Sequence, residues 1–144
     1  MTLLIKNVTY LVTCDDDNRV LKEVNVFVED GIIKSIGADV QTADDVIDGS
    51  HMVMYPGLIN THHHLYQTFS RNLPEVQNME LFPWLKTLYE IWKNLNPDTV
   101  YYSSLTGMGE LLKTGCTCCL DHHYVFPAGT DHSYLLTVLL CCGS

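Results

Sequence analysis

Basic residues are scarce in this chain of 144 residues, which carries 8 Lys and Arg against 17 Asp and Glu and has a formal net charge of -9. Such an acidic chain repels phosphate backbones, so we expect no nucleic-acid partner. Charged residues as a whole make up only 17% of the chain, whereas hydrophobic residues make up 47%. A disordered chain has the opposite balance, and the composition therefore predicts a globular protein with a packed core.

Long apolar segments and a secretory leader are also missing. No window approaches the roughly 20 apolar residues that a membrane-spanning helix needs, and the apolar stretch at residues 134–142 is far too short. Residues 1–12 contain an early Lys, no long apolar run and no small-residue cleavage site. We therefore expect no membrane partner and a cytoplasmic location.

The chain has six cysteines but lacks a second C-x-x-C pair beside Cys116 and Cys119. Without a secretory signal, reduced thiols are expected. The C-x-x-C spacing occurs in thiolate zinc sites, but positions i and i+3 of a strand face opposite sides of a sheet. We therefore interpret Cys116, Cys118 and Cys119 as small hydrophobic residues of a buried strand.

The first third of the chain is rich in β-forming residues. Its alternating pattern predicts strands at residues 3–12, 20–29, 32–36, 44–48 and 52–55. Asp30-Gly31 suits a type I′ turn between the second and third of these strands. Five short strands are too few to close a sandwich, so this sheet is expected to need further strands.

The sequence after Pro56 predicts one parallel strand–helix–strand unit. Residues 58–61 and 116–121 are short apolar runs typical of buried strands, and residues 66–78 lack periodicity and predict a loop. Between them, apolar residues recur at helical spacing in two segments. Asn78 is the expected cap of the first helix and Asn96 of the second, with Gly115 as the stop. This order favours a βαβ unit.

Three adjacent histidines come directly after the first of these strands. Side chains at i and i+2 share one face of a strand, so His62 and His64 can present their imidazoles to one point while His63 cannot. Two neutral imidazoles suit zinc and also iron. Spacing alone leaves a second interpretation open, namely ordinary polar residues at a strand end.

The run from Pro56 to His64, PGLINTHHH, resembles the Pro-Gly-…-His-x-His signature of the amidohydrolase superfamily. The resemblance implies that His62 and His64 bind a divalent metal, zinc or alternatively iron. It implies an α/β fold in which residues 1–56 are the N-terminal part of a composite β-sandwich. Residues 57–144 would then be the incomplete start of a (β/α)8 barrel, containing its first βα units.

Several further segments are similar to one deaminase branch of that superfamily, which includes 8-oxoguanine deaminase and hydroxytriazine aminohydrolases. They are HLYQT, RNLP, LFPWL and the region from TGCT to DHHY. The resemblance implies hydrolytic deamination of a purine- or triazine-like ring, a small-molecule substrate with 8-oxoguanine preferred. Guanine deaminase and S-adenosylhomocysteine deaminase are the alternative activities. The sequence leaves the oligomeric state of the full-length protein undecided, with a homo-oligomer as one option.

Four residues are candidate substrate contacts, each with a structural alternative. Gln67 either hydrogen-bonds a ring edge or tethers a loop. Trp84 either walls the substrate pocket or belongs to the core face of a helix. His122 and His123 either reach the substrate at the barrel mouth or serve the structure, and Asp121 is expected to fix a loop.

The resemblance also implies residues that this chain lacks. Two further histidines, a Glu and an Asp would come from later strands, and His132 lies too soon after the second strand to replace them. Residues 132–144 do not resemble the corresponding segment of the family. We therefore predict an inactive fragment with no catalytic residue, from a truncated or frame-shifted gene or an incomplete sequence record. A non-catalytic product or binding piece is the alternative.

Overall fold

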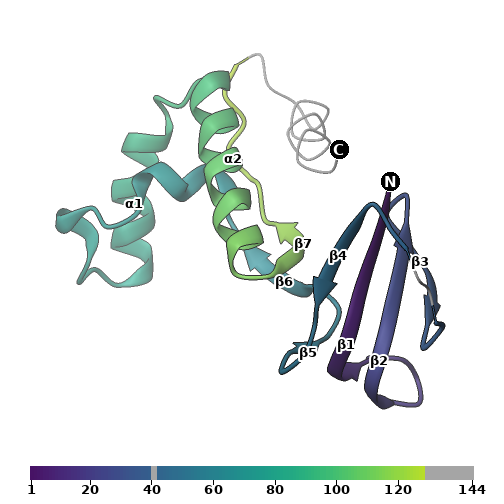
Figure 1. The fold of residues 1–144 in the computed structure, drawn as a ribbon. Coiled ribbons are helices and arrows are strands. Elements are labelled where there is room, and N and C mark those ends of the chain that lie inside the picture. Colours follow the sequence, from purple (N-terminus) through teal and green to yellow (C-terminus); the bar gives the residue numbers. More distant parts are fainter. Residues whose placement is uncertain (40–41, 129–144) are drawn as a thin grey trace. The chain divides into compact units, whose positions relative to one another are not determined.

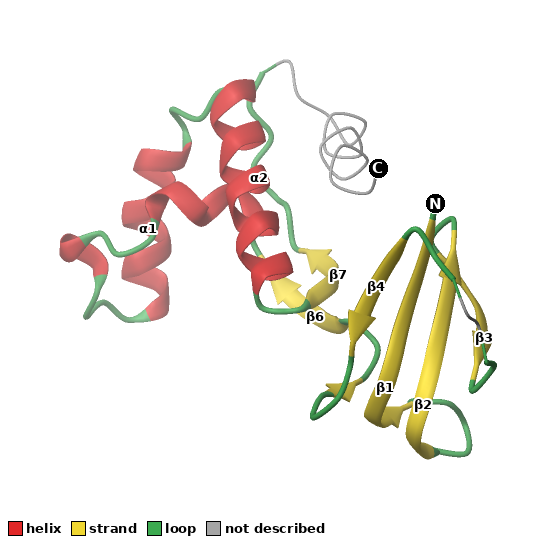
Figure 2. Ribbon diagram, viewed as in Figure 1, coloured by secondary structure: helices red, strands yellow, loops and turns green. Residues whose placement is uncertain are grey.

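The computed structural model describes residues 1–39 and 42–128 and divides the chain into two compact units, Met1–Pro56 and Gly57–Ser144 (Figure 1). The first unit is built of strands and the second contains all the described helices (Figure 2). No helix in the described ranges is long and apolar enough to cross a membrane.

The first unit is one five-stranded sheet. Its strands are β1 (Thr2–Val12), β2 (Val20–Glu29), β3 (Ile32–Ile36), β4 (Asp45–Asp48) and β5 (Val53–Met54). β1, β2 and β3 pair in antiparallel fashion, whereas β4 and β5 both run parallel to β1. Val8, Leu11 and Val26 form the buried cluster of this sheet.

The turn between β2 and β3 has the predicted geometry. Asp30 and Gly31 both have positive φ, at 50° and 76°, as a type I′ turn requires. The sheet nevertheless leaves large apolar side chains exposed on β3 and β4, among them Ile32 at 60% and Val46 at 55%. This exposure agrees with a sheet that needs further strands.

The second unit contains the predicted parallel strand pair. β6 (Leu58–His63) pairs in parallel with β7 (Cys116–Asp121). Two 3-10 helices, η1 (Leu65–Ser70) and η2 (Pro74–Val76), and two α-helices, α1 (Leu81–Trp92) and α2 (Pro97–Lys113), lie between them in the chain. The largest buried cluster is Tyr66, Val76, Leu88, Trp92 and Val100.

Helix α2 begins where the sequence predicts. The Asn96 side chain accepts a hydrogen bond from the Thr99 backbone, and the Thr99 hydroxyl accepts one from the Asn96 backbone. This capping box satisfies two backbone donors that the helix cannot satisfy itself. Gly115, with φ of 81°, lies just past the C-terminal end.

Three local predictions were wrong. Residues 66–78 form η1 and η2 instead of a loop, because short 3-10 turns leave no 3.6-residue apolar pattern to detect. The N-cap of α1 is Glu80, without a side-chain cap bond, and not Asn78. Of the strand cysteines only Cys116 is buried, whereas Cys118 is exposed because β7 pairs only with β6 among the described residues.

Close approach of the two strands makes Gly57 sensitive to substitution. A Cβ at Gly57 would lie 2.0 Å from Thr117 Oγ1 and 2.5 Å from Thr117 Cγ2. We expect Gly57→Ala to lower the free energy of unfolding by about 1–3 kcal/mol, the usual cost of overpacking. Chemical denaturation measures the change. Gly109→Ala in α2 is the control, because its Cβ would meet nothing within 4 Å and helix propensity favours Ala. Equal losses of unfolding free energy in both variants would contradict the steric argument.

Candidate metal centre

His62 and His64 converge at the C-terminal end of β6. Their Nε2 atoms lie 3.2 Å apart, and the rings meet edge to face with centroids 5.0 Å apart. Two nitrogens that each lie about 2.0–2.1 Å from a tetrahedral zinc ion are about 3.3 Å from one another. The separation of the Nε2 atoms therefore fits one shared metal ion.

The backbone carbonyl of His122, the residue after β7, fixes the tautomer of His64. Its Nδ1 lies 2.8 Å from the backbone oxygen of His122, and a carbonyl can only accept, so Nδ1 carries the hydrogen. Neutral His64 therefore has its lone pair on Nε2, the atom that faces His62. A ligating histidine commonly donates its other ring N–H to a carbonyl in this way.

The ring of His62 is held by stacking. It lies nearly parallel to the ring of His122, with centroids 4.5 Å apart and an interplanar angle of 20°. The His122 Nε2 in turn lies 3.3 Å from the backbone oxygen of Thr61. The backbone N–H of His62 donates to Asn60 Oδ1 at 2.9 Å, which fixes the end of the strand.

His63 points away from this pair. Its ring lies beside Gly107 of α2, and its buried Nδ1 has no hydrogen-bond partner among the described residues. Burial lowers the pKa of His63, against a smaller opposing effect of the Asp121 charge. The two-residue period of the strand thus separates His63 from its neighbours.

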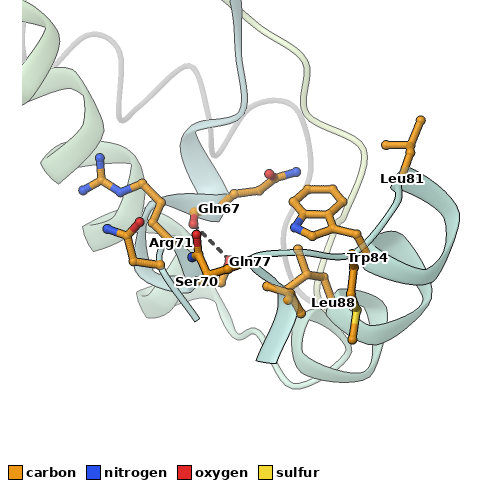
Figure 3. Close-up of a pocket in the computed structure, with 10 residues that line it drawn as sticks. Gln67, Ser70, Arg71, Gln77, Leu81, Trp84 and Leu88 are labelled. Atoms are coloured by element: carbon orange, nitrogen blue, oxygen red, sulfur yellow. Dashed lines mark hydrogen bonds between the residues drawn. The ribbon is translucent and has the colours of Figure 1, made fainter. Parts of the chain in front are cut away.

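Gln67 lies three residues after His64, and hydrogen bonds hold its side-chain amide. Its Nε2 donates to the phenol oxygens of Tyr66 at 2.9 Å and Tyr124 at 3.0 Å. The same residue lines a cavity of about 500 Å³ between η1, η2 and the start of α1. Trp84 and Arg71 also line this cavity, as Figure 3 shows.

Trp84 lies both in the cavity wall and against the core, so the structure leaves both predicted roles open. It is half-buried, packs against the core cluster of the second unit and meets the ring of Trp92 edge to face at 5.9 Å. Its position in the cavity wall leaves its indole accessible to a ligand.

The two histidines after β7 occupy different environments. His122 is exposed and touches both His62 and His64 through its ring. The His123 side chain is only 5% exposed and packs against Tyr66 and Phe126. Its Nδ1 lies 3.4 Å from Asp121 Oδ2, but without hydrogen-bond geometry. Of the two, the structure places only His122 beside His62 and His64.

Tyr124 ends the DHHY segment but was not among the predicted site residues. Its phenol oxygen accepts a hydrogen bond from the Gln67 amide, and its ring lies 5.5 Å from that of His64. Asn60 belongs to the signature, but its role in holding His62 could not be deduced from spacing. Within residues 1–39 and 42–128, no group of three or more His, Cys, Asp or Glu side chains is placed to hold a metal. His132 lies outside the described residues.

The sequence profile of the amidohydrolase family matches residues 53–134, more than half of the chain. The chain belongs to the amidohydrolase family. The match includes His62, His64 and all of the described βαβ unit.

Two relatives of this family member are similar in sequence. The 8-oxoguanine deaminase of Pseudomonas aeruginosa is 46% identical over 110 residues, which cover 74% of this chain and 24% of that protein. Hydroxydechloroatrazine ethylaminohydrolase of Pseudomonas sp. (strain ADP) is 35% identical over 136 residues, covering 85% of this chain and 28% of that protein.

A solved structure is similar in fold. It is the atrazine chlorohydrolase of Arthrobacter aurescens TC1 in complex with zinc, with a TM-score of 0.84 and 28% identity over 98% of this chain and 33% of that protein. The predicted fold class, α/β with part of a β-sandwich followed by the first βα units of a barrel, is confirmed. The chain spans about a quarter to a third of the length of these relatives.

Proposed function

We propose that this chain is part of a longer metal-dependent aminohydrolase, which removes an amino group from a purine- or triazine-like ring. The observation that carries the proposal is the 3.2 Å approach of His62 Nε2 and His64 Nε2 at the end of β6, within the signature run of the family. The names of the similar proteins support the reaction class, since they include an 8-oxoguanine deaminase and an ethylaminohydrolase.

In this proposal His62 and His64 hold a divalent metal, zinc in preference to iron. Zinc is present in the similar atrazine chlorohydrolase structure, and a pair of imidazoles suits zinc. A bound metal of this kind supplies Lewis acidity, which lowers the pKa of water towards neutrality. His122 orients both ligands, one through its carbonyl and the other through its ring.

The cavity beside Gln67 is the proposed substrate pocket. Trp84 presents an indole for stacking on a planar ring, and Gln67 can both donate to and accept from a ring edge once its amide leaves the two tyrosines. His122, whose ring lies beside His62 and His64, is a second proposed contact, and His123, although buried, stays a candidate from the sequence. The preferred substrate is 8-oxoguanine, and guanine or S-adenosylhomocysteine are the alternatives.

Ammonia release tests this proposal. The full-length enzyme, meaning the longer protein of which this chain is part, is purified with zinc and offered 8-oxoguanine, guanine, hydroxytriazines and S-adenosylhomocysteine. We expect kcat/KM for 8-oxoguanine to exceed the others by at least about tenfold, a difference of about 1.4 kcal/mol. Release from another substrate alone would correct the substrate, and no release from any would contradict the proposed reaction.

A further inference from the structure

The backbone of Leu65, directly after His64 in the chain, is held at both its N–H and its carbonyl. Its N–H donates to Asp121 Oδ1 of β7 at 2.9 Å. Its carbonyl accepts from Thr68 Oγ1 at 2.8 Å and from Ser103 Oγ of α2 at 2.9 Å. Two of these three partners lie 38 and 56 residues away in the sequence, so distant elements converge on the backbone of one residue.

The surroundings of this residue are closely packed. Leu65 is 2% exposed and Ser103 0% exposed. A Cβ at Gly107, one helical turn after Ser103, would lie 2.9 Å from Thr68 Oγ1 and 3.0 Å from Leu65 Cδ2. Helix η1 therefore rests directly on α2, and the backbone at Leu65 has little room to rotate.

Local chain geometry does not fix His64 by itself. His64 is the N-cap of η1 with φ of -136° and ψ of 80°, and its side chain makes no cap bond to the helix. The ψ angle of His64 sets the plane of the His64–Leu65 peptide, whose N–H is the one that Asp121 binds. Holding this N–H and the next carbonyl therefore limits the backbone rotation that would swing the His64 ring.

We propose that Ser103 and Asp121 are positioning residues for the metal-binding pair, because they hold the two peptide groups that flank Leu65 and thereby aim His64 Nε2 at the metal. The inference rests on the proposed function, since the metal is the ligand that the pair receives. The C-terminal end of β7 and the residue after it then hold His64 at two points. The Asp121 carboxylate binds the backbone N–H that follows His64, and the His122 carbonyl binds the His64 ring.

The chain offers a matched control for a merely structural role. Ser104 is adjacent to Ser103 on α2 and is 1% exposed, but its Oγ has no hydrogen-bond partner among the described residues. Alanine at either position removes one buried hydroxyl from the same helix. Only the Ser103 change removes a donor from the Leu65 carbonyl, which then keeps Thr68 Oγ1 alone, so a difference in metal affinity between the two variants reports positioning.

The test is zinc affinity of the metal-free full-length enzyme, measured by competition with a chromogenic chelator, with thermal unfolding as the check on folding. Loss of an outer partner of a metal ligand weakens metal binding by about 10–100-fold, and we expect about tenfold for Ser103→Ala and Asp121→Ala. Ser104→Ala is expected to stay within about twofold of the parent. Asp121→Asn keeps an oxygen acceptor for the Leu65 N–H and is expected to restore most of the affinity.

Each outcome decides a separate question. Equal affinities for Ser103→Ala and Ser104→Ala, or Asp121→Asn as weak as Asp121→Ala, would overturn the positioning role. Should Ser103→Ala fail to fold, the Asp121 pair carries the comparison alone. A parent enzyme whose zinc affinity does not change on His62→Ala would instead overturn the proposed metal site, and the positioning role with it.

Discussion

Alanine at His62 or His64 is expected to strip the metal from the full-length enzyme and to abolish turnover. The two Nε2 atoms face each other at 3.2 Å, so each variant removes one of the two ligands that converge at the end of β6. Catalytic zinc sites have about three protein ligands, and one fewer leaves too little affinity to survive dialysis. Metal stabilisation of developing charge amounts to several kcal/mol, so we expect kcat/KM to fall at least about a thousandfold.

Elemental analysis after dialysis and ammonia release together measure this loss. His63→Ala is the control, because that ring lies between the two ligands in sequence but points towards Gly107. It is expected to keep its zinc stoichiometry while losing some stability to the cavity it leaves. Wild-type zinc content and rate in His62→Ala would show that the metal lies elsewhere.

The convergence of this pair was predictable because strand geometry is periodic. A spacing of two residues places His62 and His64 on one face whatever the rest of the protein does. The turn at Asp30-Gly31 and the cap at Asn96 were predictable for a similar reason, since each depends on a few adjacent residues. Local rules were therefore enough for the strands, the second helix and the direction of the two imidazoles.

The support of the pair was not predictable in this way. Two partners of the Leu65 backbone lie 38 and 56 residues away, and no local pattern distinguishes Ser103 from Ser104. The 3-10 helix η1 is stabilised by Thr68 and Ser70 hydroxyls that bond back three residues, a feature without apolar periodicity. The tether of Gln67 to Tyr124 similarly depends on how the chain returns after β7.

The 144-residue chain, purified as it stands, is expected to show no deaminase activity. Its βαβ unit leaves apolar strand residues in water: Ile59 is 69% exposed, Leu120 58% and Leu58 50%. In a barrel such side chains are covered by neighbouring strands and helices. Uncovered edges favour aggregation, and the missing burial removes much of the roughly 25 cal/mol per Å² that offsets chain entropy. We therefore also expect low solubility.

The chemistry leads to the same expectation. Within the described residues only His62 and His64 converge on one point, so the rest of the coordination is left to water and zinc should be lost on dialysis. The family resemblance implies a proton-shuttling carboxylate from a later strand, and Asp121 is not expected to replace it, because its Oδ1 accepts the Leu65 N–H. The assay is ammonia release from 8-oxoguanine, guanine and hydroxytriazines by the zinc-loaded chain, with the full-length enzyme as the positive control. Turnover of about one per second or faster, an ordinary enzymatic rate, would show that two histidines and the residues around them suffice, and the assignment of the missing groups to later strands would be wrong.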